Sequence, residues 1–139
     1  TLDRSSAASD VYKRQLMSLT LTCNIESITD SRIPEIKIME MLCNNNIKIK
    51  MDIHRKLNLF KPSEKVNFVI SKNLPQYNEG EDFVAHGYIV AKRSENENTV
   101  IYISLWGFLV LLTTPDKEVA KSFNVMDKVY IKISHSKAQ

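Results

Sequence analysis

The chain reads Val100-Ile-Tyr-Ile-Ser-Leu-Trp-Gly-Phe-Leu-Val-Leu-Leu112 and, after a short polar connection, Phe123-Asn-Val-Met-Asp-Lys-Val-Tyr-Ile-Lys-Ile133. Isoleucine, valine and aromatic residues are dense in both runs, and these side chains favour the pleated, half-buried surface of a β-strand. We therefore predict one strand over residues 100–112 and a final strand over about 125–133. Gly107 interrupts the first run at a point where we expect a barrel strand to bend or bulge.

The runs upstream show the two-residue period of strands that bury one face. Apolar and polar residues alternate over residues 19–26, and most clearly over residues 47–54. The three asparagines at 44–46 favour a tight turn, because asparagine tolerates left-handed backbone angles. Residues 36–42 and 47–53 are therefore predicted to form a hairpin.

The remaining segments are short and separated by polar turns. We predict further strands from residue 66 and over 83–92, loops over 71–82 and 94–98, and one helical turn near 114–118 with Pro115 at its first position. No segment supports a long amphipathic helix. Six to eight short strands favour an antiparallel sandwich or barrel, and closing the sheet into a small Greek-key barrel would remove its exposed edges.

Length and composition exclude several classes of protein. A chain of 139 residues fits one domain, and its net charge of +3 is too small to identify a nucleic-acid binder. The longest apolar run, 105–112, is far short of the roughly 20 residues that a membrane-spanning helix needs. Residues 1–16 show no periodicity and resemble translated sequencing read-through. We expect them to be a non-native or disordered extension, and we expect residues 17–139 to form one domain.

The two cysteines, Cys23 and Cys43, are far apart in sequence and include no Cys-x-x-Cys pair, which argues against a zinc site. The favoured interpretation is two reduced, buried thiols that act as small apolar side chains. A Cys23–Cys43 disulfide is the alternative for an oxidising or hyperthermophilic setting.

The C-terminal third carries a spaced set of aromatic, small and aliphatic residues. They are Tyr102, Ser104, Gly107, Leu109, Leu112, Phe123, Val125, Val129 and Tyr130. Their order and spacing resemble the C-terminal part of one family, the small shared subunit 8 of nuclear RNA polymerases and its archaeal counterpart. Segments at 50–52, 57–60, 65–70 and 83–89 are also similar, so the resemblance covers nearly all of residues 17–139.

The chain departs from that family at three places. Trp106 stands where the family often has a second glycine, and His86 stands where it has a tyrosine. A short segment, 74–82, replaces the long acidic loop of the nuclear proteins, so the chain looks more like the archaeal form. The resemblance implies an all-β fold: a small antiparallel Greek-key barrel of OB type, with short helical turns at most.

No constellation of residues predicts catalysis, a cofactor or a metal. His54, His86 and His135 are scattered, and none has a partner at ligand spacing. Trp106 is either core filling or an interface anchor, since tryptophan is enriched in binding hot spots, and Tyr88 and Tyr102 pose the same choice.

Residues 48–56 place several cations on one predicted face, and a nucleic-acid groove there would need aromatic stacking platforms. The region offers only Phe60 for that purpose. The basic residues are Lys48, Lys50, Arg55 and Lys56.

The resemblance implies a non-catalytic structural subunit of DNA-directed RNA polymerase. It would support assembly and stability of the transcription complex by contacting the largest subunit, with other polymerase subunits as further partners. The expected location is the cytoplasm of an archaeal-type cell, with no membrane partner and with weak or absent direct nucleic-acid binding. The alternative is a free-standing OB-fold protein that binds single-stranded nucleic acid.

Overall fold

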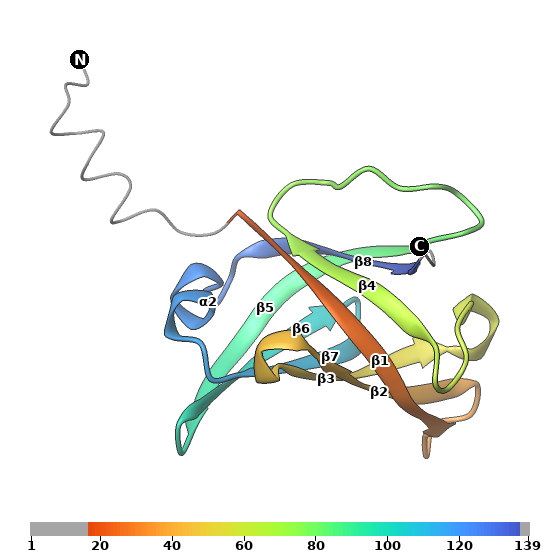
Figure 1. Ribbon diagram of the computed structural model, residues 1–139, viewed down its shortest axis with the longest axis horizontal. Coiled ribbons are helices and arrows are strands. Elements are labelled where there is room, and N and C mark those ends of the chain that lie inside the picture. The colour runs from red at the N-terminus through yellow and green to blue at the C-terminus, as the bar shows by residue number, and fades with distance from the viewer. Residues whose placement is uncertain (1–16, 137–139) are drawn as a thin grey trace, which may run out of the picture.

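Antiparallel strands close into a barrel in the computed structural model, which describes residues 17–136 (Figure 1). Around the barrel the order is β1-β2-β3-β7-β6-β5-β8-β4. The strands are β1 (Ser18–Asp30), β2 (Ile36–Cys43), β3 (Lys48–His54), β4 (Lys65–Ser71), β5 (Phe83–Glu95), β6 (Asn98–Leu105), β7 (Phe108–Thr114) and β8 (Lys128–His135). The described helical elements are α2 (Lys117–Ser122) and the short 3-10 turns η1 (Asn44–Asn46) and η2 (Arg55–Leu57).

Two Greek keys build this barrel. The first three strands form a meander, and β4 returns to pair with β1, which gives the spatial order β4-β1-β2-β3. Strands β5, β6 and β7 form a second meander, and β8 returns to pair with β5. That arrangement is the Greek key, here used twice. The β3–β7 and β4–β8 pairings join the two halves, and the predicted all-β antiparallel Greek-key barrel is confirmed.

Side-chain alternation explains why these segments are strands. In β1 and β3 the apolar members of each alternating run point inward, and Leu21, Ile25, Ile49 and Met51 are almost completely buried. The predicted hairpin of 36–42 with 47–53 is confirmed by the β2–β3 register, and the turn between them uses Asn45 and Asn46 at positive φ. The core of the barrel is apolar and also buries Phe68 and Phe123 completely.

Residues 100–112 do not form the single strand that their composition predicts. The run belongs to two strands, β6 and β7, and Leu105 pairs directly with Phe108 across a two-residue turn. The turn residues Trp106 and Gly107 have φ angles of 56° and 100°. Two successive positive φ angles match the type I′ turn, whose twist suits a tight hairpin. Gly107 therefore reverses the chain and does not bend or bulge a continuous strand.

Two other boundaries also differ from the prediction. The final strand begins at Lys128, because Val125 and Met126 lie in a turn that precedes it. The helix begins after Asp116, whose carboxylate accepts hydrogen bonds from the backbone N–H groups of the first turn. Pro115 therefore lies before the N-cap and not at the first helical position. Aspartate is a preferred N-cap residue, because its carboxylate satisfies backbone N–H groups that have no partner within the helix.

Cys23 and Cys43 form a disulfide, so the favoured interpretation of two reduced thiols is wrong for this structure. The two residues are directly opposite each other in the β1–β2 register, and both point into the buried side of the sheet. Sequence spacing alone leaves this register undetermined, so it is compatible with both states of the cysteines. The bond covalently joins the first two strands within the core.

The expectation about residues 1–16 concerns a segment outside the described residues. Within 17–136, no helix is long and apolar enough to cross a membrane. Backbone pairing begins at the first described residue, because the carbonyl of Met17 accepts a 2.8 Å hydrogen bond from the N–H of Lys72.

Candidate functional site

Trp106 lies at the surface, at the tip of the β6–β7 hairpin. Its exposed fraction is 75%, so the interpretation of Trp106 as core filling is wrong. The backbone N–H of Gly107 donates a 3.1 Å hydrogen bond to Ser104 Oγ, which holds the tip. The indole ring meets the His86 ring edge-on, with 5.6 Å between centroids and an interplanar angle of 89°. The contact with His86 therefore orients the indole ring, and most of its surface remains accessible to solvent.

Tyr88 belongs to the same outer side of the barrel. It lies on β5 between Ser104 of β6 and Lys128 of β8, and it is 45% exposed. Two residues earlier on β5, His86 pairs with Tyr130 of β8, and the centroids of their rings are 5.8 Å apart. Because alternate residues of a strand face the same side, Tyr88 and His86 share one surface.

We call the surface formed by His86, Tyr88, Trp106 and Tyr130 the aromatic face. Its cation is Lys128, whose Nζ lies 5.4 Å from the centroid of the Tyr130 ring. An ammonium above an aromatic ring is a favourable arrangement at a protein surface. The aromatic face thus combines large apolar rings with one positive charge.

Tyr102 lies further along β6, away from Trp106. It pairs with Ala91 of β5 and is half-buried. Arg93 covers it: the guanidinium carbon lies 6.0 Å from the ring centroid, and Nη1 donates a 3.3 Å hydrogen bond to the phenolic oxygen. Of the three residues singled out by sequence, the structure brings Tyr88 and Trp106 onto one surface and leaves Tyr102 beside it.

Sequence reasoning missed an exposed apolar group next to Tyr88. The turn that carries Met126 lies against β5, where the Met126 N–H donates to the Ile89 carbonyl at 2.7 Å. Val90, Val125 and Met126 are 49%, 47% and 77% exposed. In the sequence Val125 resembles the start of a strand, because an apolar residue in a turn gives no periodic signal of its own. The turn is evident only in the structure, where Met126 has a φ of 81°.

Among the residues that the structure describes, none supplies an aromatic platform beside the basic residues of β3. Lys48 and Lys50 are exposed on the outer side of β3, where Leu111 and Thr113 of β7 are their neighbours. Phe60, the aromatic residue expected there, is only 4% exposed and packs against the ring of His135. Phe60 is therefore a core residue and cannot stack on a base.

The three histidines occupy separate places with separate roles. His54 caps η2 by accepting the N–H of Lys56, and His135 pairs with Glu64. His86 packs within the aromatic face. Among residues 17–136, no group of three or more histidine, cysteine, aspartate or glutamate side chains could hold a metal ion.

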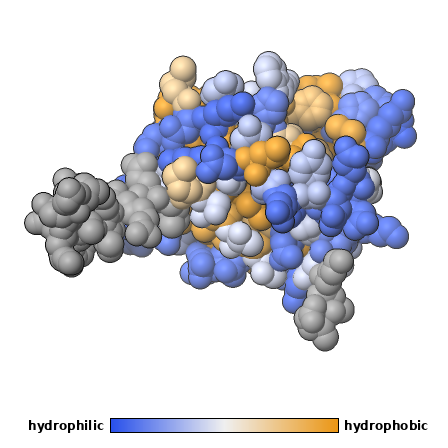
Figure 2. Space-filling model, turned by 90° about the horizontal axis from the view of Figure 1, so that it is seen from above, coloured by the Kyte–Doolittle hydropathy of each residue, from blue (hydrophilic) through white to orange (hydrophobic). Residues whose placement is uncertain are grey.

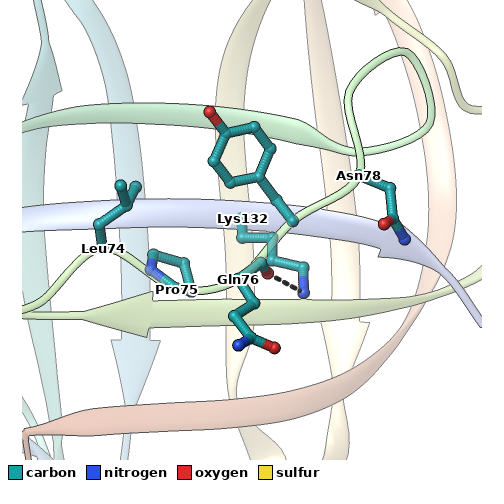
Figure 3. Close-up of a pocket in the computed structure, with 6 residues that line it drawn as sticks. Leu74, Pro75, Gln76, Asn78 and Lys132 are labelled. Atoms are coloured by element: carbon teal, nitrogen blue, oxygen red, sulfur yellow. Dashed lines mark hydrogen bonds between the residues drawn. The ribbon is translucent and has the colours of Figure 1, made fainter.

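The β4–β5 connection crosses the outside of the barrel and forms an open hollow. Pro75, Gln76 and Asn78 line it, and Lys132 Nζ of β8 donates a 2.8 Å hydrogen bond to the Gln76 carbonyl (Figure 3). Figure 2 views the molecule from the side of this loop and shows exposed apolar residues between hydrophilic ones. Because the loop itself binds the one lysine that lines the hollow, this interaction anchors the loop to the barrel.

Comparisons with known proteins point to one family. The family model for the G subunit of DNA-directed RNA polymerase matches residues 18–136. The protein named DNA-directed RNA polymerase subunit Rpo8 from Sulfolobus acidocaldarius is 37% identical over 111 residues, which cover 78% of this chain and 91% of that protein. The Saccharolobus solfataricus protein of the same name is 35% identical over 120 residues, covering 81% and 89%. The Saccharolobus shibatae protein is 38% identical over 119 residues, again covering 81% and 89%.

A solved structure of the cytoplasmic molybdate-binding protein ModG, with molybdate bound, is 10% identical to this chain. The match covers 85% of this chain and 91% of that one, with a TM-score of 0.35. A likeness of this size carries no conclusion about ligand or function.

Proposed function

This chain belongs to the family of the G subunit of DNA-directed RNA polymerase, of archaeal type, and from that premise we propose that it is a non-catalytic structural subunit that supports assembly and stability of the transcription complex. A subunit of the polymerase has other polymerase subunits as partners. The partner we propose for direct contact is the largest subunit, and the location is the cytoplasm of an archaeal-type cell.

The observation that carries the proposal is the state of Trp106. Its backbone has a φ of 56°, a region that bulky side chains rarely adopt, and its side chain is 75% exposed. Asparagine or glycine would suit this turn position better, and an exposed indole adds nothing to the core. Backbone strain that the fold does not need supports a role in function. Tryptophan is also among the residues most enriched in binding hot spots.

The surroundings of Trp106 have the composition of an interface centre. Tyr88 lies on the same surface, and Val90 and Met126 extend it along β5. Aromatic residues and methionine are enriched at the centres of protein interfaces, where charged residues are depleted. Lys128 marks one border of this surface. We therefore assign the contact with the polymerase to the aromatic face, with Tyr102 and Arg93 at its margin.

Closure of the barrel limits the possible mode of contact. Each of the eight described strands pairs with two neighbours over part of its length, so none has an edge that is open from end to end. This favours contact through side chains, which requires exposed apolar anchors. Tyr88 and Trp106 supply two of them.

The test is co-purification with the assembled polymerase. A Tyr88→Ala, Trp106→Ala double variant should lose at least about tenfold in retention, since one interface hot spot contributes about 2 kcal/mol or more. Tyr77→Ala is the matched control for Tyr88, because Tyr77 is 43% exposed and lies in the β4–β5 loop. Circular dichroism should show that each variant remains folded.

A photo-crosslinking residue at position 106 identifies the partner. Crosslinks from Trp106→benzoylphenylalanine should map to the largest subunit by mass spectrometry. Crosslinks to a different subunit would overturn the choice of partner, and full retention of the double variant would overturn the choice of surface.

A further inference from the structure

Lys128 of β8 is an exposed cation beside the aromatic face that has no counter-ion in its own chain. Its ammonium group lies 5.4 Å from the centroid of the Tyr130 ring, and none of the ion pairs found among residues 17–136 includes it. In the β5–β8 register Lys128 is directly opposite Tyr88, so the two side chains adjoin each other. A partner that covers Tyr88 therefore also meets the charge of Lys128.

The three neighbouring strands β4, β8 and β5 supply no carboxylate to Lys128 (Figure 1). Strands β4 and β8 contain no acidic residue, and the acidic residue of β5, Glu95, lies at its far end, where it pairs with Asn98. Strand β8 adds a second cation, Lys132, whose Nζ donates to the carbonyl of Gln76. This side of the barrel is therefore positively charged.

The residue directly before each of these strands is acidic, but each of the three carboxylates already binds within the chain. Asp127, before β8, accepts a 2.8 Å hydrogen bond from the backbone N–H of Asn124. Asp82, before β5, accepts a backbone N–H of its own loop at 2.9 Å. Glu64, before β4, pairs with His135. Each of these carboxylates thus serves to close a turn or to join two strands, and none pairs with the lysine.

With the docking of the aromatic face as its premise, we propose that Lys128 selects a protein segment in which a carboxylate lies next to apolar side chains. Docking on Tyr88 removes water from the ammonium group opposite, and a desolvated charge is costly unless an opposite charge pairs with it. An aspartate or glutamate of the largest subunit supplies that charge. Complementary charges across an interface also fix its orientation and exclude wrong partners.

The surface beyond Lys128 distinguishes a protein segment from other anions, because it is aliphatic. Val90, Val125 and Met126 are all exposed, and the turn that carries Met126 is bound to β5 at the carbonyl of Ile89. A phosphate backbone has no apolar groups with which to cover these side chains. A segment with an acidic residue among apolar ones matches both the lysine and its aliphatic surroundings.

The test measures the affinity of the tagged full chain for polymerase depleted of this subunit, by titration at several salt concentrations. Lys128→Gln nearly keeps the length of the side chain but removes its charge, and it should weaken binding about tenfold and reduce the dependence on salt. Lys128→Glu should weaken binding at least about a hundredfold, because it brings two like charges together. Lys128→Arg keeps the charge and should stay within about threefold of the wild-type chain.

Lys65→Gln is the matched control. Lys65 is an exposed lysine at the end of β4 that adjoins His135, far along the β4–β8 ladder from Lys128, and no ion pair found in the described part of the chain includes it. The variant removes the same charge and should change affinity less than about twofold. Circular dichroism should show that the variants remain folded. If Lys128→Glu does not fold, the neutral Lys128→Gln still provides the test.

Failure of this inference differs from failure of the proposed contact surface. Wild-type affinity of Lys128→Gln and Lys128→Glu, together with lost retention of the Tyr88→Ala, Trp106→Ala double variant, would overturn the inference and keep the surface. Full retention of the double variant would overturn the surface itself. Equal losses for Lys128→Gln and Lys65→Gln would show that only net charge matters. Displacement of the wild-type chain from the polymerase by oligothymidylate, absent for Lys128→Gln, would assign the lysine to a nucleic acid and would also overturn the inference.

Carbodiimide coupling in the assembled polymerase identifies the carboxylate. The reagent joins the Lys128 amine to a contacting carboxyl group as an amide, with loss of water, and mass spectrometry locates the acidic residue. Replacing that residue by lysine should improve the binding of Lys128→Glu at least about tenfold, since the charges are then exchanged. No improvement would overturn the pairing, as would a sample in which other lysines of this chain couple to the polymerase and Lys128 does not.

Discussion

Gly87 of β5 and Ser104 of β6 approach so closely that no side chain fits between them. A Cβ on Gly87 would lie 1.8 Å from the backbone oxygen of Ser104 and 2.8 Å from its carbonyl carbon. Both atoms are backbone, so the clash cannot be relieved by rotating a side chain. The glycine allows β5 to pack tightly against β6. Tyr88 follows Gly87 on β5, and Trp106 directly follows the end of β6.

Gly87→Ala should therefore lower the free energy of unfolding by about 2–3 kcal/mol, the usual cost of forcing extra atoms into a packed interior. A urea titration measures it. Gly80→Ala is the matched control, because an added Cβ there meets no atom within 4 Å and the strain comes only from a φ of 81°. A cost at Gly87 no larger than at Gly80 would show that the two strands can separate freely.

Gly107→Val should destabilise the barrel by roughly 1–3 kcal/mol, because a β-branched side chain strains the backbone at a φ of 100°. The cause is the tight turn and not crowding, since the space around Gly107 is open. Gly107→Asn should cost distinctly less than Gly107→Val, because asparagine tolerates positive φ. Equal stability of all three proteins in denaturant would remove the requirement for a left-handed residue here.

Trp106→Asn should have opposite effects on stability and on binding. Asparagine before glycine is the preferred type I′ pair, so the free energy of unfolding should rise by about 0.5–1 kcal/mol. Retention by the polymerase should fall as for Trp106→Ala. A decrease in stability would instead indicate that the indole contributes to folding through its contact with His86.

Reducing the Cys23–Cys43 disulfide should destabilise the domain. The cysteines are 20 residues apart, and closing a loop of this size contributes about 3 kcal/mol, equivalent to roughly 10 °C in melting temperature. Thermal unfolding with and without a reductant measures the effect. The double variant Cys23→Ala, Cys43→Ala should melt at one temperature in both conditions. A wild-type chain insensitive to reductant, with two alkylatable thiols, would mean that the bond does not form.

A chain that begins at Met17 should keep the melting temperature of the full chain. The first described backbone hydrogen bond is made by the Met17 carbonyl, and β1 pairs with β4 from Ser18 onward. A chain that begins at Leu21 is the informative comparison, because it loses the pairs of Ser18, Leu19 and Thr20 with β4. A drop of more than a few degrees for the Met17 chain would show that residues 1–16 contribute to the fold.

The strands were predictable where one face alone is buried. In β1 and β3 the inward residues are apolar and their neighbours along the strand are mostly polar, so the two-residue period is visible in the sequence. The β6–β7 hairpin was not predictable in this way. Trp106-Gly107 has the glycine of a typical Asn-Gly turn but not the asparagine, and it lies between two apolar runs. The composition of residues 100–112 therefore indicates one continuous strand.

The candidate site was predictable only in part. Residue type pointed to Tyr88 and Trp106, and the structure shows both exposed. Their common surface depends on which strands are neighbours, and the pairing of β5 with both β6 and β8 is a long-range property. The contact of Lys92 with α2 depends on the same property, since Lys92 Nζ donates a hydrogen bond to the carbonyl of Ala120, which lies 28 residues further along the chain. Single-sequence periods carry no information on such long-range neighbours.

Closure of the barrel has a consequence for the exchange of this subunit. A protein that docks by lending a strand must break main-chain hydrogen bonds when it leaves, and it often cannot exist alone. Here every described strand has both neighbours within the chain, and the disulfide ties two of them together. With the proposed contact through the aromatic face, detachment should expose rings to water without separating paired strands, so we expect that the subunit can leave the enzyme and rejoin it without refolding.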